Sequence, residues 1–266
     1  MPTAPGVALV TGASAGIGAA YSDRLAARGH ALVLVARDQV RLERSAERLR
    51  NEIGVEVEVL AADLAGEDDL RRVEQRLRAD DISMLVNNAG IAIPGRMIEM
   101  DAGQLQSMLL LNVVASTRLA RAAIPGMVAR GRGDIVMVGS VVGLNADRPG
   151  ISAAYTATKA YLMALSEGLS GELRKTGVRV QAVLPGVTRT EIWGKARIDV
   201  EGLAGDVIME AGVMVDAALA GLEMGEEVTI PALDDIAAWE SLKAARDAMR
   251  PYLSRQTPAA RYRTVS

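Results

Sequence analysis

The chain has 266 residues, half of them hydrophobic, which is the composition of an ordinary globular protein. Its 30 basic and 33 acidic residues give a net charge of −3 at pH 7, so the sequence offers no excess of positive charge for binding nucleic acid. Cysteine is absent and His30 is the one histidine, so the composition excludes disulfides, thiolate metal sites and a Ser-His-Asp triad, and we expect no bound metal. No apolar run approaches the roughly 20 residues of a membrane span and the start of the chain lacks a secretion signal, so we expect a cytoplasmic protein with neither a membrane nor a nucleic acid as partner.

Short apolar runs rich in Val, Leu and Ile alternate along the chain with stretches of helical periodicity. The runs predict buried strands at 6–11, 31–36, 55–60, 82–86, 135–138, 178–184 and 228–230. Helices are expected at about 16–28, 38–52, 67–80, 101–130, 152–176 and 239–252. This alternation predicts an α/β fold of the Rossmann type: a doubly wound, seven-stranded, mainly parallel sheet with helices on both faces. We expect one domain over residues 1–266, with a core of about 6–231 and a helical C-terminal extension of about 232–266.

A glycine-rich turn follows the first predicted strand. The sequence Thr11-Gly12-Ala13-Ser14-Ala15-Gly16-Ile17-Gly18 leads directly into a helical pattern. A strand, a glycine turn and a helix N-terminus together present backbone N–H groups to a phosphate. Gly12 is expected to make the tight turn, Gly16 to admit a pyrophosphate and Gly18 to let the helix pack on the sheet. A glycine loop can also serve packing alone.

The end of the second predicted strand, Ala36-Arg37-Asp38, bears on cofactor preference. In dinucleotide folds this position faces the adenosine ribose, where an acid accepts hydrogen bonds from a free 2′-hydroxyl. Ala36 cannot do so, whereas Arg37 can meet a 2′-phosphate with a charge-assisted fork. Asp38 competes as a ribose ligand, but we favour it as the cap of the next helix. The sequence therefore favours NADP(H) over NAD(H), with NAD(H) possible.

Polar and small residues follow other strands at the sheet edge where ligands bind in this architecture. Asp63 can accept a hydrogen bond from an adenine amine or simply stabilise a turn. Asn88-Ala89-Gly90 suits a backbone that passes close to a flat ligand, and equally an ordinary turn. Asn112 stands among apolar residues of a predicted helix, so its amide must be satisfied by another helix, or by a water or backbone group at an active site.

Tyr155 and Lys159 are four residues apart at the start of a predicted helix and therefore share one face. A tyrosine titrates near 10, and a neighbouring cation favours the phenolate, so we expect Lys159 to lower the pKa of Tyr155. Ser140, delivered by the end of the fifth strand, can help to hold an oxygen that changes charge. Alone, the spacing also fits a surface pair that supports the helix.

Together these motifs resemble the classical short-chain dehydrogenase/reductase family over roughly residues 6–231. The matching positions are Thr11-Gly12-x-x-x-Gly16-x-Gly18, Asp63, Asn88-Ala89-Gly90, Asn112, Ser140, Tyr155-x-x-x-Lys159 and Pro185-Gly186 with Thr190. The resemblance implies that Tyr155 is the general acid/base and that Lys159 holds the nicotinamide ribose and lowers the Tyr155 pKa. It also implies that Ser140 binds the substrate oxygen and that Asn112 keeps a water that relays protons to Lys159.

The resemblance further implies a nicotinamide dinucleotide bound across the strand ends. Its expected ligands are Gly12, Ser14, Ala15, Gly16, Ile17, Gly18, Arg37, Asp63, Leu64, Asn88, Ala89, Gly90, Tyr155, Lys159, Pro185, Gly186, Val187 and Thr190. Val187 and Thr190 would hold the carboxamide, Val187 through its backbone. In NADP-preferring members a basic residue often precedes the second loop glycine, and here that residue is Ala15, which leaves Arg37 as the main carrier of a 2′-phosphate.

The expected reaction is NADP(H)-dependent hydride transfer between nicotinamide and a small-molecule carbonyl or secondary alcohol. The substrate wall is expected to be apolar and the substrate hydrophobic or aromatic; the wall residues are Val141, Val142, Leu144, Ile192 and Trp193. Residues 191–212 form either a lid over the pocket or an ordinary loop and helix. The alternatives are an NAD-dependent alcohol dehydrogenase of the same family and a non-catalytic dinucleotide sensor, which would usually have lost Tyr155 or Lys159. A sugar epimerase or dehydratase would need a larger C-terminal domain.

The two long predicted helices carry small and apolar residues on more than one face. These residues are Ala115, Ala122, Ala123, Ala160, Ala164 and Gly168. Surplus apolar surface on a helix favours a subunit interface, so we expect a homodimer or homotetramer. The other possibility is that these helices pack more of their own subunit.

Overall fold

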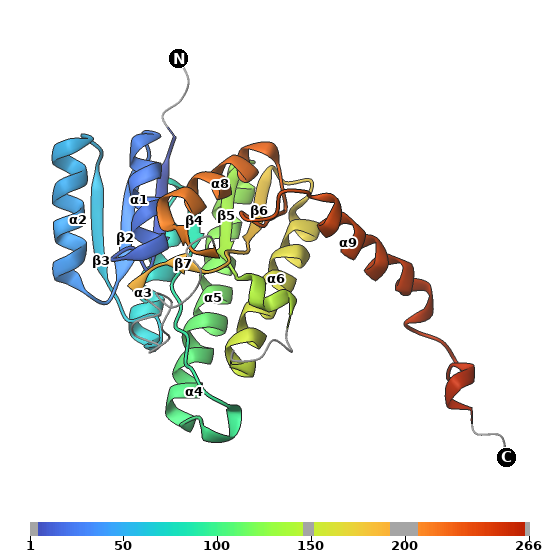
Figure 1. The fold of residues 1–266 in the computed structure, drawn as a ribbon. Coiled ribbons are helices and arrows are strands. Elements are labelled where there is room, and N and C mark those ends of the chain that lie inside the picture. The colour runs from blue at the N-terminus through green and yellow to red at the C-terminus, as the bar shows by residue number, and fades with distance from the viewer. Residues whose placement is uncertain (1–4, 146–151, 192–206, 264–266) are drawn as a thin grey trace. The chain divides into compact units, whose positions relative to one another are not determined.

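The computed structural model describes residues 5–145, 152–191 and 207–263 (Figure 1). The chain divides into two compact units, Met1–Pro231 and Ala232–Ser266. The first unit contains the sheet and its covering helices, and the second is helical. The two units are described separately below.

The first unit is built on one seven-stranded sheet with strand order β3-β2-β1-β4-β5-β6-β9. All of its neighbouring strands pair in parallel, as the sequence predicts. The strands are β1 (Val7–Thr11), β2 (Ala31–Ala36), β3 (Val57–Ala61), β4 (Ile82–Asn87), β5 (Gly133–Val138), β6 (Val178–Val183) and β9 (Val228–Thr229). The order reverses between β1 and β4, and in open α/β sheets a crevice at such a switch point is where ligands bind.

Alternate residues of the central strands enter two separate hydrophobic layers. Ala8 and Val10 of β1 pack in one layer, whereas Leu9 between them packs in the other. Successive side chains of a strand point to opposite faces of the sheet, so a strand covered on both faces must be apolar at every position. This requirement explains the continuous apolar runs in the sequence.

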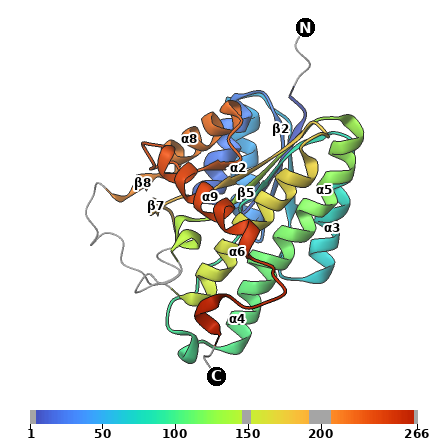
Figure 2. The same ribbon diagram turned by 90° about the vertical axis from the view of Figure 1, so that its right-hand side faces the viewer.

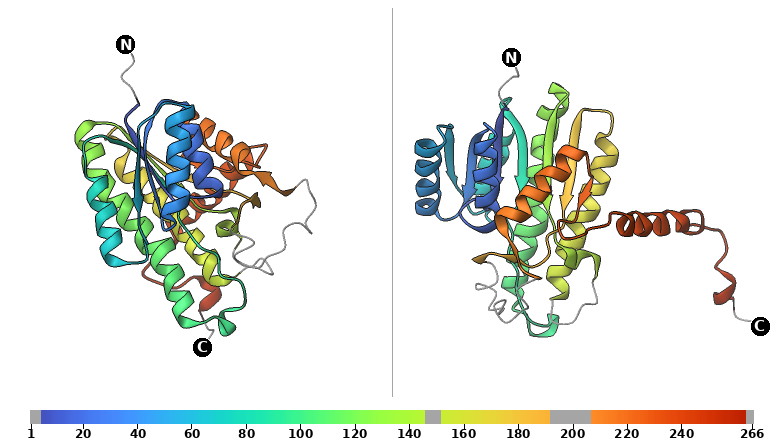
Figure 3. Two further views of the ribbon diagram at one scale, coloured as in Figure 1. Left: turned by 90° about the vertical axis from the view of Figure 1, so that its left-hand side faces the viewer. Right: turned by 45° about the horizontal axis from the view of Figure 1, so that its top comes forward.

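Helices cover both faces of the sheet, and Figures 2 and 3 show them as layers on its two sides. The first layer is formed by α1 (Gly16–Ala27), α2 (Gln39–Glu52) and α8 (Ala211–Met224). The second is formed by α3 (Glu67–Leu77), α5 (Ser116–Arg130) and α6 (Ala153–Leu173). The seven-stranded Rossmann-type fold with helices on both faces is therefore confirmed.

The helix predicted at 101–130 is interrupted. It consists of α4 (Ala102–Leu109), a π-helical turn at Leu110–Ala115, and α5. By length and composition alone the stretch Ala102–Arg130 is long and apolar enough to cross a membrane, although it is not a continuous apolar run. Core helices of soluble proteins pass the same test. In this fold the stretch supplies buried residues such as Leu119 and Met127 to the core.

Smaller elements complete the chain. Strands β7 (Thr188–Arg189) and β8 (Met209–Glu210) form a separate parallel pair beside the main sheet. Short 3-10 turns lie at Met97–Glu99 and Val141–Leu144. In the C-terminal unit, α9 (Ala237–Met249) is followed by 3-10 turns at Arg250–Tyr252 and Ala260–Tyr262, close to the helix expected there.

Candidate active site

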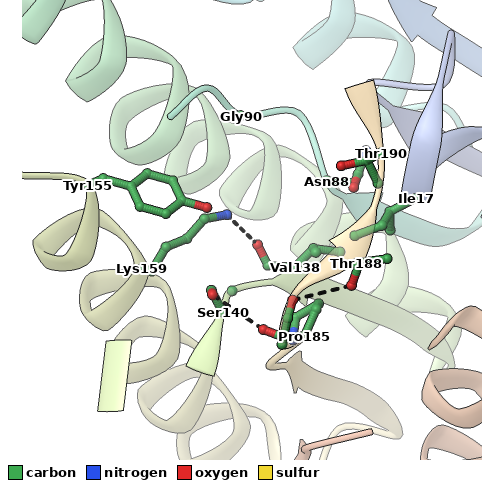
Figure 4. Close-up of a pocket in the computed structure, with 12 residues that line it drawn as sticks. Ile17, Asn88, Gly90, Val138, Ser140, Tyr155, Lys159, Pro185, Thr188 and Thr190 are labelled. Carbon is green, nitrogen blue, oxygen red and sulfur yellow. Dashed lines mark hydrogen bonds between the residues drawn. The ribbon is translucent and has the colours of Figure 1, made fainter. Parts of the chain in front are cut away.

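Two adjoining pockets lie at the carboxyl ends of the strands. The larger is a groove of about 1110 Å³ that runs past the ends of β1, β2, β3 and β4. The smaller, about 70 Å³, lies beyond it at the ends of β5 and β6 and contains Ser140, Tyr155 and Lys159 (Figure 4). Ile17, Asn88, Gly90 and Thr190 line both. The groove is as large as pockets that hold drug-sized ligands, so an extended molecule fits in it with one end beside Tyr155.

The glycine loop has the geometry of a phosphate site. Gly12 and Gly16 have φ angles of +67° and +56°, which residues with a side chain rarely adopt. A Cβ on Gly12 would lie 2.7 Å from Asn88 Nδ2, and one on Gly18 would lie 2.2 Å from the carbonyl oxygen of Gly12. Helix α1 begins at Gly16 with no side-chain cap, so its first N–H groups are available to an anion. Gly18 packs beneath the loop rather than lining the groove.

Thr11 fastens the glycine loop to the end of β4. Its hydroxyl donates to the carbonyl of Val86 at 3.2 Å and accepts from the backbone N–H groups of Asn88 at 2.9 Å and Ala89 at 3.0 Å. Asn88 Nδ2 donates to the carbonyl of Thr11 at 2.9 Å. These bonds hold the carboxyl ends of β1 and β4 together where the two strands line the groove.

Charged residues gather where the groove passes the end of β2. Asp38 caps α2 by accepting from the N–H of Arg41 at 3.0 Å, as the sequence predicts. The guanidinium of Arg41 donates to both carboxylate oxygens of Glu191 at 2.8 Å, and this bond raises the Arg41 pKa. Among the described residues, no hydrogen bond or ion pair joins Arg37 to a partner. Arg37 thus lines the groove as a cation that makes no ion pair within the described part of the chain.

The groove also brings together the residues after β3 and β4. Asp63 and Leu64 line it, and Asp63 also stabilises its own turn by accepting from the N–H of Ala65 at 3.1 Å, so both roles expected of Asp63 are compatible with its position. Asn88, Ala89 and Gly90 line it as well.

Asn112 lies in the π-helical turn and is 1% exposed. Its Oδ1 accepts from the N–H of Ile91 at 2.9 Å, and its Nδ2 donates to the carbonyl of Ile91 at 2.9 Å and to Thr158 Oγ1 at 3.1 Å. π-Helical turns occur frequently at functional sites. The amide is satisfied by a backbone segment next to the pocket and by α6, and it lines neither pocket itself.

Tyr155 and Lys159 lie on the pocket side of α6 and are 9% and 6% exposed, so they are not a surface pair. Lys159 Nζ donates to the carbonyl of Val138 at 2.9 Å and lies 5.7 Å from the centre of the Tyr155 ring. In Figure 4 the phenol oxygen and the amine point into the same space.

The expected lowering of the Tyr155 pKa is wrong for this structure. Burial raises the pKa of Tyr155 to about 12 and lowers that of Lys159 to about 8. Both shifts have one cause, the loss of water around the charged form of each group. The sequence reveals the spacing of the pair, but not how deeply the fold buries it.

Ser140 faces this pair from the end of β5. Its hydroxyl donates to the carbonyl of Pro185 at 3.3 Å and accepts from the N–H of Val142 at 3.3 Å (Figure 4). Pro185, Gly186 and Thr190 line the small pocket. Val187 lines neither pocket, and its carbonyl accepts from the N–H of Met209 at 2.9 Å where β7 meets β8.

The expected substrate residues are only partly near Tyr155. Val142 packs in a cluster with Tyr155, Met108 and Ala154, whereas Val141 and Leu144 lie in the same 3-10 turn but line neither pocket. Ile192 and Trp193, and most of the expected lid at 191–212, lie outside the described residues.

Sequence reasoning missed several lining residues. They are Arg41, Ile91, Ala92, Ile93, Asp101, Gly103, Gln104, Ser107, Leu111, Thr188 and Glu191, with Val138 and Gly139 at the end of β5. Two signals were available: Arg41 is a second arginine four residues after Arg37, and the apolar run Ile91–Ile93 directly follows Asn88-Ala89-Gly90. The α4 residues carry no such signal, because only the fold brings them to the groove.

These features suit a nicotinamide dinucleotide. The glycine loop and the free start of α1 fit a pyrophosphate, Arg37 fits an additional phosphate, and the small pocket places Tyr155 and Lys159 at the far end. Among the described residues, there is no group of three or more acidic or histidine side chains that could hold a metal ion.

Comparison with known proteins agrees with this arrangement. Residues 6–201 match the family model described as short chain dehydrogenase. A short-chain dehydrogenase from Sphingobium yanoikuyae, solved in complex with NADPH, is 49% identical with a TM-score of 0.93, covering 97% of this chain and 100% of its own. A bulky-bulky ketone specific alcohol dehydrogenase from Comamonas testosteroni is 42% identical with a TM-score of 0.89, covering 98% and 99%.

A more distant relative is the very-long-chain 3-oxoacyl-CoA reductase-B of Danio rerio, which is 32% identical over 189 residues, covering 70% of this chain and 60% of that protein. This chain thus spans less than two thirds of that relative's length. The match of most of the chain to one family model, together with the sheet order and the pockets at its switch point, leads to one conclusion: the chain belongs to the short-chain dehydrogenase/reductase family and is an oxidoreductase.

Proposed function

We propose that this enzyme uses NADPH to reduce a bulky, hydrophobic or aromatic ketone to a secondary alcohol, and that it catalyses the reverse reaction with NADP⁺. The observation that carries the proposal is that the two pockets adjoin and share four lining residues: Arg37, which has no ion-pair partner among the described residues, lines the groove, and the buried Tyr155 and Lys159 line the small pocket next to it. The related structures are described as an NADPH complex and a bulky-bulky ketone specific alcohol dehydrogenase, and both descriptions support it.

In this proposal Tyr155 is the acid. A bound nicotinamide supplies the hydride that adds to the carbonyl carbon. Tyr155 donates its phenolic proton to the carbonyl oxygen, and the Ser140 hydroxyl gives up its long bond to the carbonyl of Pro185 and donates to the same oxygen. Lys159, held by the carbonyl of Val138, places a positive charge beside the phenolate that remains. A preorganised charge of this kind lowers the barrier most in a site from which water is excluded.

The substrate preference rests on the surroundings of Tyr155. The cluster around it is apolar and contains Met108, Val142 and Ala154, with Ile91, Ala92, Ile93, Met100 and Leu105 packed against it. Pockets of this kind take most of their binding energy from apolar contact. We therefore place a hydrophobic or aromatic substituent of the ketone against this cluster.

The direct test is a panel of aryl and alkyl ketones and secondary alcohols with NADPH and NADH, followed by nicotinamide absorbance. We expect faster reduction of bulky aryl ketones than of short aliphatic ones, and tighter binding of NADPH than of NADH. Tyr155→Phe should lower turnover by about 10²-fold or more while NADPH still binds. Near-normal turnover in this variant would remove Tyr155 from its role.

The cofactor preference has its own test. Arg37→Gln should weaken NADPH binding by about tenfold or more and leave NADH binding unchanged, because only NADPH carries the 2′-phosphate. Arg44→Gln is the control, since Arg44 is an exposed arginine of α2 that does not line the groove. An equal effect of Arg37→Gln on both cofactors, or a clear preference of the wild type for NADH, would favour the NAD-dependent alternative.

We also propose that the protein acts as a cytoplasmic homo-oligomer whose core folds as one domain. Support for an interface comes from exposed apolar side chains on α4, the π-helical turn, α5 and α6: Leu109, Val114, Val128 and Tyr161. Light scattering coupled to size exclusion tests this, and a mass of 28.0 kDa, that of the single chain, would contradict it.

A further inference from the structure

Thr158 lies on α6 between Tyr155 and Lys159, but on the side that faces the interior. It is 1% exposed and lines neither pocket. Its hydroxyl donates to the carbonyl of Tyr155 at 2.7 Å, and the same oxygen accepts from Asn112 Nδ2 at 3.1 Å. Thr158 thus connects the helix that carries Tyr155 with the π-helical turn that carries Asn112.

The direction of these bonds is fixed by chemistry. A hydroxyl has one hydrogen, and here it is directed to a backbone carbonyl, which can only accept. The remaining lone pairs of Thr158 Oγ1 must therefore accept, so the Asn112 amide must present its NH₂ group to Thr158 and its oxygen to the N–H of Ile91. A flipped amide would set oxygen against oxygen at Thr158 and at the carbonyl of Ile91.

The amide in turn holds a wall of both pockets. Asn112 bonds the N–H and the carbonyl of Ile91, and the preceding residue, Gly90, lines the groove and the small pocket. The Cβ position of Gly90 lies 3.2 Å from Asn112 Oδ1 and 3.8 Å from Lys159 Nζ. The Gly90–Ile91 backbone is thus held in place directly against Lys159 and the cluster around Tyr155.

We propose that Thr158 is a positioning residue for hydride transfer: through its hydroxyl it sets the orientation of the Asn112 amide, which fixes the Gly90–Ile91 backbone opposite Tyr155 and Lys159. The proposal rests on the proposed function, because it assigns Thr158 a part in the ketone reductase reaction. A displacement of about 1 Å in a reacting group can cost about 10²-fold in rate, so the hydroxyl matters even though it touches no substrate.

The experiment compares Thr158→Val, which keeps the shape but cannot accept a hydrogen bond, with Thr158→Ser, which retains the hydroxyl. Ser166→Ala is the matched control: Ser166 is a buried residue of the same helix whose hydroxyl donates to the carbonyl of Leu162 at 2.7 Å, away from both pockets. Each variant is measured by NADPH titration, by single-turnover reduction of a bulky aryl ketone, and by hydrogen exchange of the Ile91 amide.

For Thr158→Val we expect a single-turnover rate at least about tenfold lower, an NADPH dissociation constant within about twofold of wild type, and Ile91 amide exchange at least about tenfold faster. Thr158→Ser should restore rate and protection, and Ser166→Ala should change neither. Adding Thr158→Val to Asn112→Ala should cost little more than Asn112→Ala alone, since both residues act through one chain of bonds.

Three results would overturn the proposal: a folded Thr158→Val with wild-type rate and exchange, equal losses in Thr158→Val and Thr158→Ser, or additive losses with Asn112→Ala. A wild-type protein that binds no dinucleotide or reduces no ketone would instead refute the proposed function. The exchange measurement then still decides whether Thr158 orders the Ile91 backbone.

Discussion

Lys159 is buried at a cost to the fold. Lys159 is 6% exposed, and burial lowers its pKa from the ordinary 10.5 to about 8. Protonating the Lys159 amine is therefore less favourable in the folded protein than in the unfolded chain. At neutral pH the difference corresponds to roughly 3 kcal/mol of lost stability. The protein keeps this charge where the proposed reaction needs it.

We therefore expect Lys159→Met to raise the free energy of unfolding at pH 7 by about 1–2 kcal/mol, after subtracting about 1 kcal/mol for the lost bond to Val138. Below pH 8 both states of the wild type are protonated and the full penalty applies. Between pH 8 and 10.5 the unfolded chain holds more protons, so wild-type stability rises and the advantage of the variant shrinks. Denaturant unfolding at several pH values measures this, with the exposed Lys175→Met as control. Destabilisation by Lys159→Met at pH 7 would contradict it.

Tyr21 offers a second test at the scale of one residue. Tyr21 belongs to α1; its ring is fully buried in the core, and its hydroxyl has no hydrogen-bond partner among the described residues. Removing an unsatisfied buried hydroxyl stabilises a fold, so Tyr21→Phe should add about 1–2 kcal/mol and raise the Tm by about 2–4 °C. Tyr161→Phe is the control, because the Tyr161 hydroxyl lies 2.9 Å from Thr117 Oγ1 and its loss should bring no gain. A lower Tm for Tyr21→Phe would show that its hydroxyl is satisfied.

The sequence predicts the role of an individual residue when that role depends on residues close to it in the chain. The capping role of Asp38 follows from its place before a helix, and the structure confirms it. The pKa of Tyr155 could not be predicted in the same way, because it depends on burial by residues distant in the chain. Thr158 could not be identified either, since its partner Asn112 is 46 positions away.

At the scale of elements, two helical glycines differ in whether the packing around them leaves room for a side chain. A Cβ on Gly18 of α1 would meet the backbone of Gly12, whereas one on Gly171 of α6 would meet nothing within 4 Å. Gly18 is thus required for helix α1 to approach the loop, while Gly171 only adds freedom to the unfolded chain.

We expect Gly171→Ala to stabilise the protein by about 0.5–1 kcal/mol and to leave NADPH binding unchanged. Gly18→Ala should lower the Tm and weaken NADPH binding at least about tenfold, because α1 must move away from Gly12 and carry the phosphate site with it. Thermal unfolding and fluorescence titration measure both effects. Unchanged NADPH affinity in Gly18→Ala would show that the loop tolerates a displaced helix.

The periodicity of the sequence predicts most elements but not every geometry. All strands of the main sheet were predicted to within a few residues, because strands buried on both faces must be continuously apolar. The π-helical turn inside the long helix was missed, because one extra residue in a turn barely changes an apolar stripe. Helix α8 was missed because Ala, Gly, Val, Leu and Met fill most of its positions, and Asp216 and Glu223 alone mark its polar face.

At the scale of the whole molecule, every described residue that lines either pocket belongs to the unit Met1–Pro231. A chain that ends after Pro231 should therefore remain folded and bind NADPH within about twofold of the full chain. Circular dichroism and fluorescence titration test this, with the full-length protein as reference. Loss of the fold or of binding would mean that residues 232–266 are part of the structural core.

The π-helical turn at Leu110–Ala115 has a consequence for how such a chain can change over generations. It contains one residue more than the α-helical turn in its place would, so it is in effect a single-residue insertion carried inside a helix. Deleting one residue would restore a regular helix, but successive residues of an α-helix are turned by about 100°, so α4 or Asn112 would then face another side. We therefore expect that the bonds from the Asn112 amide to Ile91 are kept only in chains that also keep the π-helical turn.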